Sequence, residues 1–309
     1  MADIVVVGSL NVDLTVNVPR FLQPGETMTG SKFSIFTGGK GGNQAVAAAR
    51  LGASVAMVGC VGDDANGDLY KATLEREGVA LSALRTVAGE STGVAVITVD
   101  GNGENTIAIV PGANAHLSVD VISDSEALIG GAKVCLFQLE TPMVSIQHAA
   151  ALAHAAGVKV ILDPAPAPEK PLPQALVMLC DYITPNETEL SLLTGMKVES
   201  VEEAVEASLK LIGQGAKAVI NKRGGAGALL VTREGYRVHP GFKVKAVDTT
   251  AAGDTFNAGL AMGLSMGLSV SDAINLANAA AAISVTGLGA QPAMPSFDQA
   301  TALIDGIKL

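Results

Sequence analysis

The chain has 309 residues, of which 49% are hydrophobic and 16% are charged, and this composition excludes an intrinsically disordered protein. Its net charge of -10 and its sequence pI of about 4.9 argue against a surface that neutralises nucleic-acid phosphates. The length predicts one large domain, or one with a small appendage.

The cysteines and the N-terminus predict the compartment. Cys60, Cys135 and Cys180 are far apart with no C-x-x-C spacing, which is typical of buried thiols in a reducing compartment. The apolar run from Ile4 to Val7 follows an acidic start, which favours a buried strand over a signal peptide. No run reaches the length of a membrane span, and the segment LANAAAAISVTGLG predicts a packed helix. We therefore expect a cytoplasmic protein without a membrane or nucleic-acid partner.

Short β-rich runs alternate with helical patterns along most of the chain. Strands are predicted at residues 3–9, 54–62, 132–140, 159–166, 181–186, 216–224 and 227–232. Helices are predicted at residues 43–52, 65–78, 143–157, 186–195, 201–215 and 254–267. Apolar strands that alternate with helices indicate a mainly parallel sheet covered on both faces, with ligands beyond the carboxyl ends of the strands.

Two segments break this alternation. Residues 12–37 and 93–107 alternate like hairpins, with turn signals at Pro24-Gly25 and Asp100-Gly101. They predict a small antiparallel sheet inserted into an α/β body made of residues 1–11, 38–92 and 108–309. The inserted sheet can serve as a lid over a site or as a dimer contact, and the two roles are compatible. We expect a homodimer formed through the lid strands.

Two glycine-rich elements are the candidates for ligand binding, since neither a Walker P-loop nor G-x-G-x-x-G after a strand is present. In TGGKGGNQAVAAA, the glycines permit close approach while Lys40 and Asn43 can donate to a ligand, although a flexible turn with an exposed lysine also fits. In TTAAGDTFNAG, Asp254 stands behind small residues at the start of a helical pattern. Helix capping and an anion site both fit this second element.

Together the two elements resemble the paired signatures of the ribokinase-like (PfkB) carbohydrate kinases. GSLNVD after the first strand, QLE ending at Glu140, PNETE starting at Pro185 and a GxxG turn from Gly224 to Gly227 follow in the family's order. The resemblance covers essentially the whole chain. It implies a central, mainly parallel sheet with helices on both faces and a β-sheet lid. It also implies ATP-dependent phosphorylation of a small sugar, D-ribose to D-ribose 5-phosphate, with Mg²⁺ and K⁺ as cofactors.

The sugar residues implied by the resemblance follow the first strands. A carboxylate and an amide after a strand are suited to the hydroxyls of a sugar diol. The implied sugar contacts are Asn11, Asp13, Gly39, Lys40, Asn43, Glu140 and Asp254. From the residues alone, Asp13 can equally be a turn residue, and Glu140 a solvated loop acid.

Phosphoryl transfer is assigned, by the same resemblance, to the second glycine-rich element. The backbone amides of Ala251, Ala252 and Gly253 would face the charge that develops on the transferred group. Asp254 would accept the proton of the attacking hydroxyl as a general base. That role explains a carboxylate next to an anion-binding helix start.

The resemblance also implies a nucleotide site. Its residues would be Asn186, Glu189, Lys222, Gly224, Gly227, Gly253 and Asn278, with Asn186 and Glu189 near the phosphates and the water shell of Mg²⁺. Asn186 and Glu189 also fit a helix capping box, and both roles can hold for the same residues.

A monovalent cation is the last implied ligand, at Asp248, Thr250, Ser284, Gly287 and Gly289. The alternative is that Asp248 only caps a turn. The chain departs from the family pattern in three places: Ala251 replaces a glycine, the segment Asn221-Lys222-Arg223 is more basic, and Ala293 replaces a hydroxyl residue.

Two alternatives to a ribose kinase remain open at this stage. One is a kinase of 2-deoxyribose, fructose, adenosine or another furanose or nucleoside, although only seven Phe, three Tyr and no Trp are available to stack a base. The other is a non-catalytic sugar-binding regulator, for which an intact Asp254 would be unnecessary.

Overall fold

The computed structural model describes residues 2–306, and within this range nine strands form one large sheet. They are β1 Ile4–Val7, β4 Val55–Gly62, β5 Ala80–Val87, β8 Val134–Phe137, β9 Lys159–Leu162, β10 Tyr182–Ile183, β11 Ala218–Lys222, β12 Ala228–Thr232 and β13 Gly235–His239. Their spatial order is β13-β12-β11-β10-β9-β8-β1-β4-β5, parallel from β11 to β5 and antiparallel at β12 and β13. The predicted fold class is confirmed.

Helices cover both faces of the large sheet because its central strands are apolar on both faces. On β1, Ile4 and Val6 pack into one core, whereas Val5 and Val7 pack into the other. The first core contains α1 Lys40–Arg50, α2 Ala65–Arg76, α9 Ala252–Ser265, α10 Val270–Ser284 and α11 Phe297–Asp305. The second contains α3 Val119–Asp124, α4 Glu126–Gly130, α5 Met143–Ala155, α6 Gln174–Val177, α7 Glu187–Thr194 and α8 Val201–Gly213. The 3₁₀ helices are η1 Gly112–His116, η2 Gly224–Ala226 and η3 Gln291–Ala293.

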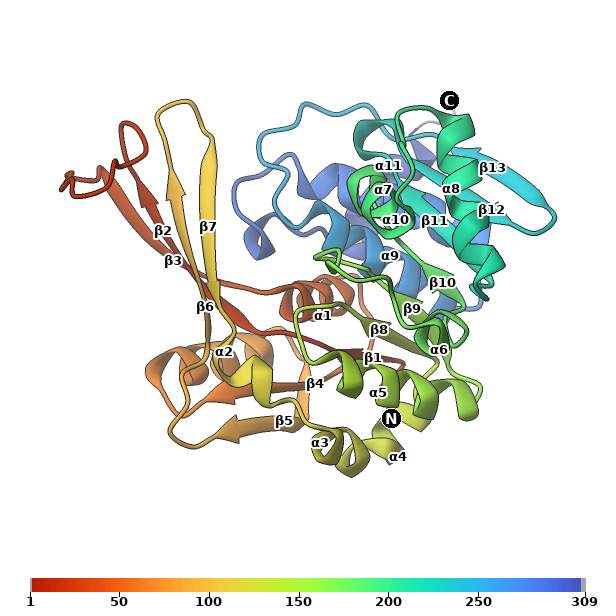
Figure 1. Cartoon of the computed structure of the whole chain (residues 1–309), viewed down its shortest axis with the longest axis horizontal. Helices are drawn as coiled ribbons and strands as arrows, with labels where there is room; N and C mark the ends of the chain where they lie inside the picture. The colour runs from red at the N-terminus through yellow and green to blue at the C-terminus, as the bar shows by residue number, and fades with distance from the viewer. Residues whose placement is uncertain (1, 307–309) are drawn as a thin grey trace.

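A second, four-stranded sheet projects from one side of the α/β body (Figure 1). Its strands are β2 Asn11–Asn17, β3 Lys32–Gly38, β6 Gly93–Val99 and β7 Asn105–Val110, in the order β3-β2-β6-β7. The β2–β3 and β6–β7 pairs are antiparallel hairpins, but the central β2–β6 pair is parallel. The prediction of a purely antiparallel sheet is therefore wrong at this pair, because both hairpins leave the body at the same end, where Asn11 faces Gly93.

The strands β5 and β13 were not among the predicted ones. Both lie at the edges of the large sheet, and both carry exposed residues instead of a continuous apolar run. The sequence predicts a strand where apolar residues are continuous, and this pattern is typical of strands that are covered on both faces. Edge strands lack that signal.

The fold brings several chain segments to one edge of the large sheet. β1, β8, β9, β10 and β11 run parallel, so the residues that follow them lie at the same edge. α1 and α9 lie against each other on one face of the sheet, with their first turns at this edge. Among residues 2–306, no helix is long and apolar enough to cross a membrane.

Candidate active site

Two adjoining cavities lie beyond the carboxyl ends of the central strands. The larger has a volume of about 440 Å³ and the smaller about 270 Å³. Both are lined by Lys222, Gly224, Thr249, Ala252 and Gly253. A single extended ligand can therefore occupy both.

The larger cavity has a mainly apolar lining. Phe242, Val244 and Phe256 contribute to it, together with Ala281 of α10 and Val285 just after that helix. Such walls suit an aromatic heterocycle, which buries a flat apolar surface.

A turn and a helix residue hold one wall of the larger cavity. Gly227 has φ of +93°, and a Cβ there would lie 2.2 Å from the carbonyl oxygen of His239, so the turn requires glycine. Nδ2 of Asn278 donates to the carbonyl oxygens of His239 and Pro240 at 3.3 and 3.4 Å. Gly227 and Asn278 thus fix the segment that leads into this wall.

The smaller cavity contains a buried carboxylate at the start of α9. Asp254 is only 7% exposed and accepts hydrogen bonds from Nδ2 of Asn43 at 3.0 Å and from Nε2 of Gln44 at 3.1 Å. Burial raises the pKa of Asp254 to about 6, with the charge of Lys40 acting to lower it and that of Asp163 to raise it. A carboxylate with this pKa is ionised at neutral pH and can still take up a proton.

The first turn of α9 presents free amides beside this carboxylate. The Ala252 amide donates to the Thr249 carbonyl at 3.2 Å, which leaves the amides of Gly253 and Asp254 without an acceptor among residues 2–306. Ala251, the N-cap, has φ of 59° and is the one non-glycine residue with positive φ in that range. Glycine adopts this left-handed conformation readily, whereas alanine there carries backbone strain.

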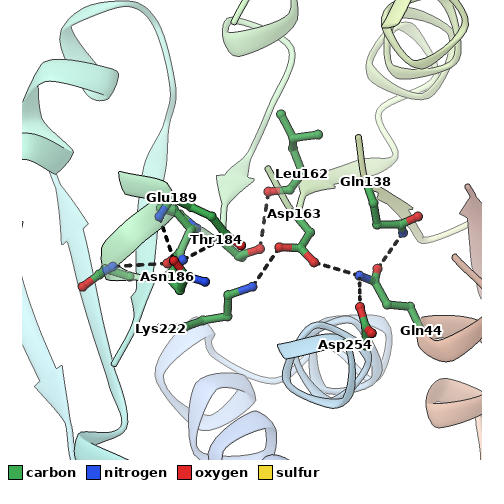
Figure 2. A network of polar contacts seen from close by, with 11 residues as sticks. Gln44, Gln138, Leu162, Asp163, Thr184, Asn186, Glu189, Lys222 and Asp254 are labelled. Atoms are coloured by element: carbon green, nitrogen blue, oxygen red, sulfur yellow. Dashed lines mark hydrogen bonds and ion pairs between the residues drawn. The ribbon is translucent and has the colours of Figure 1, made fainter. Parts of the chain in front are cut away.

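A chain of polar contacts connects Lys222, Asp163 and Asp254, which line the smaller cavity (Figure 2). Nζ of Lys222 lies 2.8 Å from Oδ1 of Asp163, and Oδ2 of Asp163 accepts from Nε2 of Gln44 at 3.0 Å. Gln44 reaches Asp254 in turn, so that two buried carboxylates share one amide group. Neither Asp163 nor Gln44 was predicted. Asp163 directly follows β9, which is the same signal that singled out other acids after strands.

The carboxylates of Asp13, Glu140 and Asp254 lie close enough to interact electrostatically. Burial, together with the negative charges of Glu140 and Asp254, raises the pKa of Asp13 to about 7. Oε2 of Glu140 accepts from Oγ of Ser9 at 2.5 Å and from the Lys40 amide at 3.1 Å. Carboxylates only accept hydrogen bonds, so this cluster favours a neutral ligand with several hydroxyl donors over an anion.

Lys40 is the cation of this cluster. Burial alone would lower its pKa, but the charges of Asp254, Asp163 and Glu140 outweigh burial and raise the pKa above its usual value. Its side chain lines the smaller cavity with Asp254. The structure therefore brings Asp13, Lys40, Asn43, Glu140 and Asp254 together.

Asn11 is held by a residue that the sequence did not reveal. Nδ2 of Asn114 donates to Oδ1 of Asn11 at 2.8 Å, and Oδ1 of Asn114 accepts from the Leu10 amide at 2.8 Å. The neighbouring Gly39 has φ of +79°, and a Cβ there would lie 2.7 Å from the Asn11 amide nitrogen. Glycine at 39 thus allows the loop before α1 to lie against Asn11.

Gln291, in η3, contacts β3, α1 and α2 and was likewise missed. Its Oε1 accepts from Oγ1 of Thr37 on β3 at 2.6 Å. Its Nε2 donates to Oδ1 of Asn43 at 3.3 Å and to the Tyr70 hydroxyl at 3.4 Å. Through Gln291 the projecting sheet is therefore tied to Asn43, which holds Asp254 and lies 248 positions from Gln291 in the sequence. No local sequence pattern carries that information.

Asn186 and Glu189 form the predicted capping box at the start of α7. The Asn186 amide donates to Oε2 of Glu189, and the Glu189 amide to Oδ1 of Asn186, each at 2.7 Å. Both residues also line the smaller cavity. Burial and the charge of Asp163 raise the pKa of Glu189, while the charge of Lys222 lowers it.

Asp248 joins the turn before α9 to the loop after α10. Its Oδ1 accepts from the amide and hydroxyl of Thr250 at 2.9 and 2.6 Å, and its Oδ2 accepts from the Gly289 amide at 2.9 Å. Burial acts to raise the pKa of Asp248, but these hydrogen bonds outweigh it and lower the pKa. The capping role is thus present.

Among residues 2–306, no three acidic, histidine or cysteine side chains are grouped to hold a metal.

These features define a class of enzyme. A buried carboxylate beside free helix amides, next to a cavity for an aromatic heterocycle, belongs to an α/β phosphotransferase that acts on a hydroxyl group. Over residues 1–296 the chain matches the family described as pfkB family carbohydrate kinase, and it belongs to this family.

The chain is also similar to individual members over nearly its full length. It is 46% identical to a ribokinase of Haemophilus influenzae, with 94% of each chain covered. It is 39% identical to a deoxyribokinase of Salmonella typhi, covering 96% of this chain and 97% of the relative. The solved structure of Arabidopsis thaliana ribokinase complexed with ribose and ATP has a TM-score of 0.92 at 36% identity, with 98% of each chain covered.

Proposed function

We propose that the protein transfers the γ-phosphoryl group of ATP to O5 of D-ribose. The observation that carries the proposal is the buried Asp254 carboxylate, which lies at the junction of the hydroxyl-binding carboxylates and the free amides of α9. The ribose O5–H proton passes to Asp254 as the O5–P bond forms. The bond from Pγ to the β–γ bridging oxygen breaks, and ADP leaves with its electron pair.

The nucleotide is assigned to the two adjoining cavities. Adenine would occupy the apolar cavity walled by Phe242 and Phe256, and the phosphates would reach the amides of Gly253 and Asp254. Mg²⁺ would neutralise phosphate charge. Mg²⁺ usually keeps several water ligands and takes few protein carboxylates, and the cavity residues fit this preference, because Glu189 and Asn186 line the cavity without forming a cluster of carboxylates. Glu189 would hold those waters.

A panel of acceptors tests the substrate, with ribose, 2-deoxyribose, fructose, adenosine and uridine in a coupled ADP-release assay. We expect ribose to be preferred over 2-deoxyribose, because Asn11 and Asp13 would bind O2 and O3. A missing 2-hydroxyl leaves a buried polar group unpaired, which costs roughly 1–3 kcal/mol in kcat/KM. Asn11→Ala should reduce this preference. Equal kcat/KM for the two pentoses would show that Asn11 and Asp13 do not read the 2-hydroxyl.

We also propose a K⁺-sized ion beside α9, held by carbonyl oxygens of Thr250, Ser284, Gly287 and Gly289 near Asp248. Asp248 already links the turn before α9 to Gly289, so an ion there would brace the amides aimed at phosphate. Activity should be higher in K⁺ than in Na⁺ or Tris at equal ionic strength, with the gain in kcat and not in sugar KM. Ala293 removes a side-chain ligand, so the gain should be modest. Indifference to the cation, with Asp248→Ala fully active, would exclude the site.

We further propose that residues 12–37 and 93–107 form a lid that pairs with a second subunit. The outer strands β3 and β7 expose Phe33, Ile35, Ile107 and Ile109, and Phe33 is 59% exposed. Open strand edges with apolar side chains favour association. Sedimentation should show a dimer that Ile35→Lys weakens, whereas Val144→Lys on α5 leaves it intact. A fully active monomer would exclude the partner but not the lid.

A further inference from the structure

Asp163 is the one buried carboxylate at the site to which the proposed reaction gives no role. It is 1% exposed at the end of β9. One oxygen contacts Nζ of Lys222 and the other accepts from Gln44, as Figure 2 shows. A buried ion pair is costly to desolvate, so stability alone is a weak explanation for its presence at this site.

The orientation of the Gln44 amide is determined by its neighbours. Nε2 of Gln138 donates to Oε1 of Gln44 at 2.7 Å. This leaves the two hydrogens of Gln44 Nε2 for two carboxylates, one to Asp163 at 3.0 Å and one to Asp254 at 3.1 Å. The reverse orientation would place an acceptor against two acceptors. Asp163 and Asp254 are therefore held in a fixed relation by a single amide group.

Lys222 lies beside the free amides of α9. A Cβ built on Gly253 would be 3.3 Å from Nζ of Lys222, and Lys222 lines both cavities. Its side chain is 11% exposed, so it borders the space that a phosphate would enter. An ammonium group has three donors, and Asp163 is its one ion-pair partner among residues 2–306.

We propose that Lys222 contacts the transferred phosphoryl group as a catalytic residue, and that Asp163 is the positioning residue that holds Lys222 and, through Gln44, Asp254. This inference rests on the proposed phosphoryl transfer. The proton of the acceptor hydroxyl still goes to Asp254, the new O–P bond forms, and ADP leaves with the electron pair. Lys222 offsets negative charge on the transferred oxygens and exchanges no proton.

The proposal makes an electrostatic prediction with opposite signs for the two partners of the ion pair. Asp254 must be ionised to accept a proton, so kcat falls as the pH drops through its pKa. Removing the negative charge of Asp163 lowers that pKa, and removing the positive charge of Lys222 raises it. The remaining charged or titratable groups at this site, common to all variants, are Asp13, Lys40, Tyr70, Glu140 and Glu189.

The experiment measures kcat against pH, at saturating sugar and nucleotide, for Asp163→Asn, Lys222→Met and the double variant. The acidic limb should move down by roughly one pH unit in Asp163→Asn, move up by a similar amount in Lys222→Met, and lie between them in the double variant. Lys222→Met should also lower kcat by roughly 10- to 100-fold with sugar KM nearly unchanged. Lys217→Met is the matched control, since Lys217 pairs with Asp181 away from the site and should leave kcat and the limb unaltered.

The proposal would be overturned if the acidic limb of the kcat–pH profile stayed at the wild-type pH in the single variants, or moved in the same direction in both. A Lys222→Met variant with wild-type kcat would also overturn it. Loss of packing alone cannot give opposite shifts.

If Asp163→Asn does not fold, Lys222→Arg replaces it in the comparison. The charge-retaining arginine must keep the wild-type limb that methionine shifts. An active Asp254→Asn would instead contradict the proposed general base, which separates the two failures.

Discussion

Asp254→Asn is expected to lower kcat by roughly 10²–10⁴-fold while sugar binding is largely retained. The carboxylate is the proposed proton acceptor, and an amide of nearly the same volume cannot take up that proton. In the structure Asp254 accepts from both Asn43 and Gln44, so an amide at 254 places one NH₂ group against a donor. Asp254→Ala avoids that clash and should show the same loss of kcat.

Initial rates at saturating ATP, with sugar affinity from calorimetry, separate the two effects. Asp298→Asn on α11 is the matched control, because Asp298 is exposed in the first turn of a helix outside the site and should leave kcat unchanged. If either variant at 254 keeps near wild-type kcat with folded protein, another group must accept the proton. If both lose sugar binding together with kcat, Asp254 serves mainly to position the sugar.

Position after a strand supported part of the site that the family resemblance implied. Asn11, Asp13, Glu140 and Asn186 follow or lie near the ends of β1, β8 and β10. Parallel strands end at one edge, so residues far apart in the chain could be expected to meet there. The same attention to residues that follow strands would have found Asp163, which directly follows β9 in the segment KVILDPAP.

The residues that hold the functional groups could not be predicted in this way. Gln44 follows Asn43 in α1, and nothing in a helical pattern separates a residue that contacts Asp163 and Asp254 from an ordinary polar one. Gln291 and Asn114 act over 248 and 103 positions of sequence. Such contacts depend on the packed positions of whole elements, which local periodicity does not encode.

Lys40→Met is the second variant expected to have a large effect. Lys40 is the cation among the acids of the proposed sugar site, and its charge opposes the rise in the pKa of Asp254. Without it, the charges of Asp13, Glu140 and Asp163 are less balanced. The pKa of Asp254 should then rise from about 6 to above neutral pH. At pH 7 the base would be mostly protonated.

The expected result is a loss of roughly 10²–10³-fold in kcat at pH 7, since protonation of the base adds to the loss of a cation beside the reacting groups. The sign of the pH dependence separates the two causes. Asp254 becomes ionised as pH rises through its elevated pKa, so part of the lost activity should return toward pH 9, whereas the wild-type enzyme should already be near its plateau at pH 7. Lys71→Met is the matched control, because Lys71 forms only a surface pair with Asp68 on α2. An acidic limb of Lys40→Met that remains near pH 6 would show that Lys40 acts on the substrate alone and leaves the base unchanged.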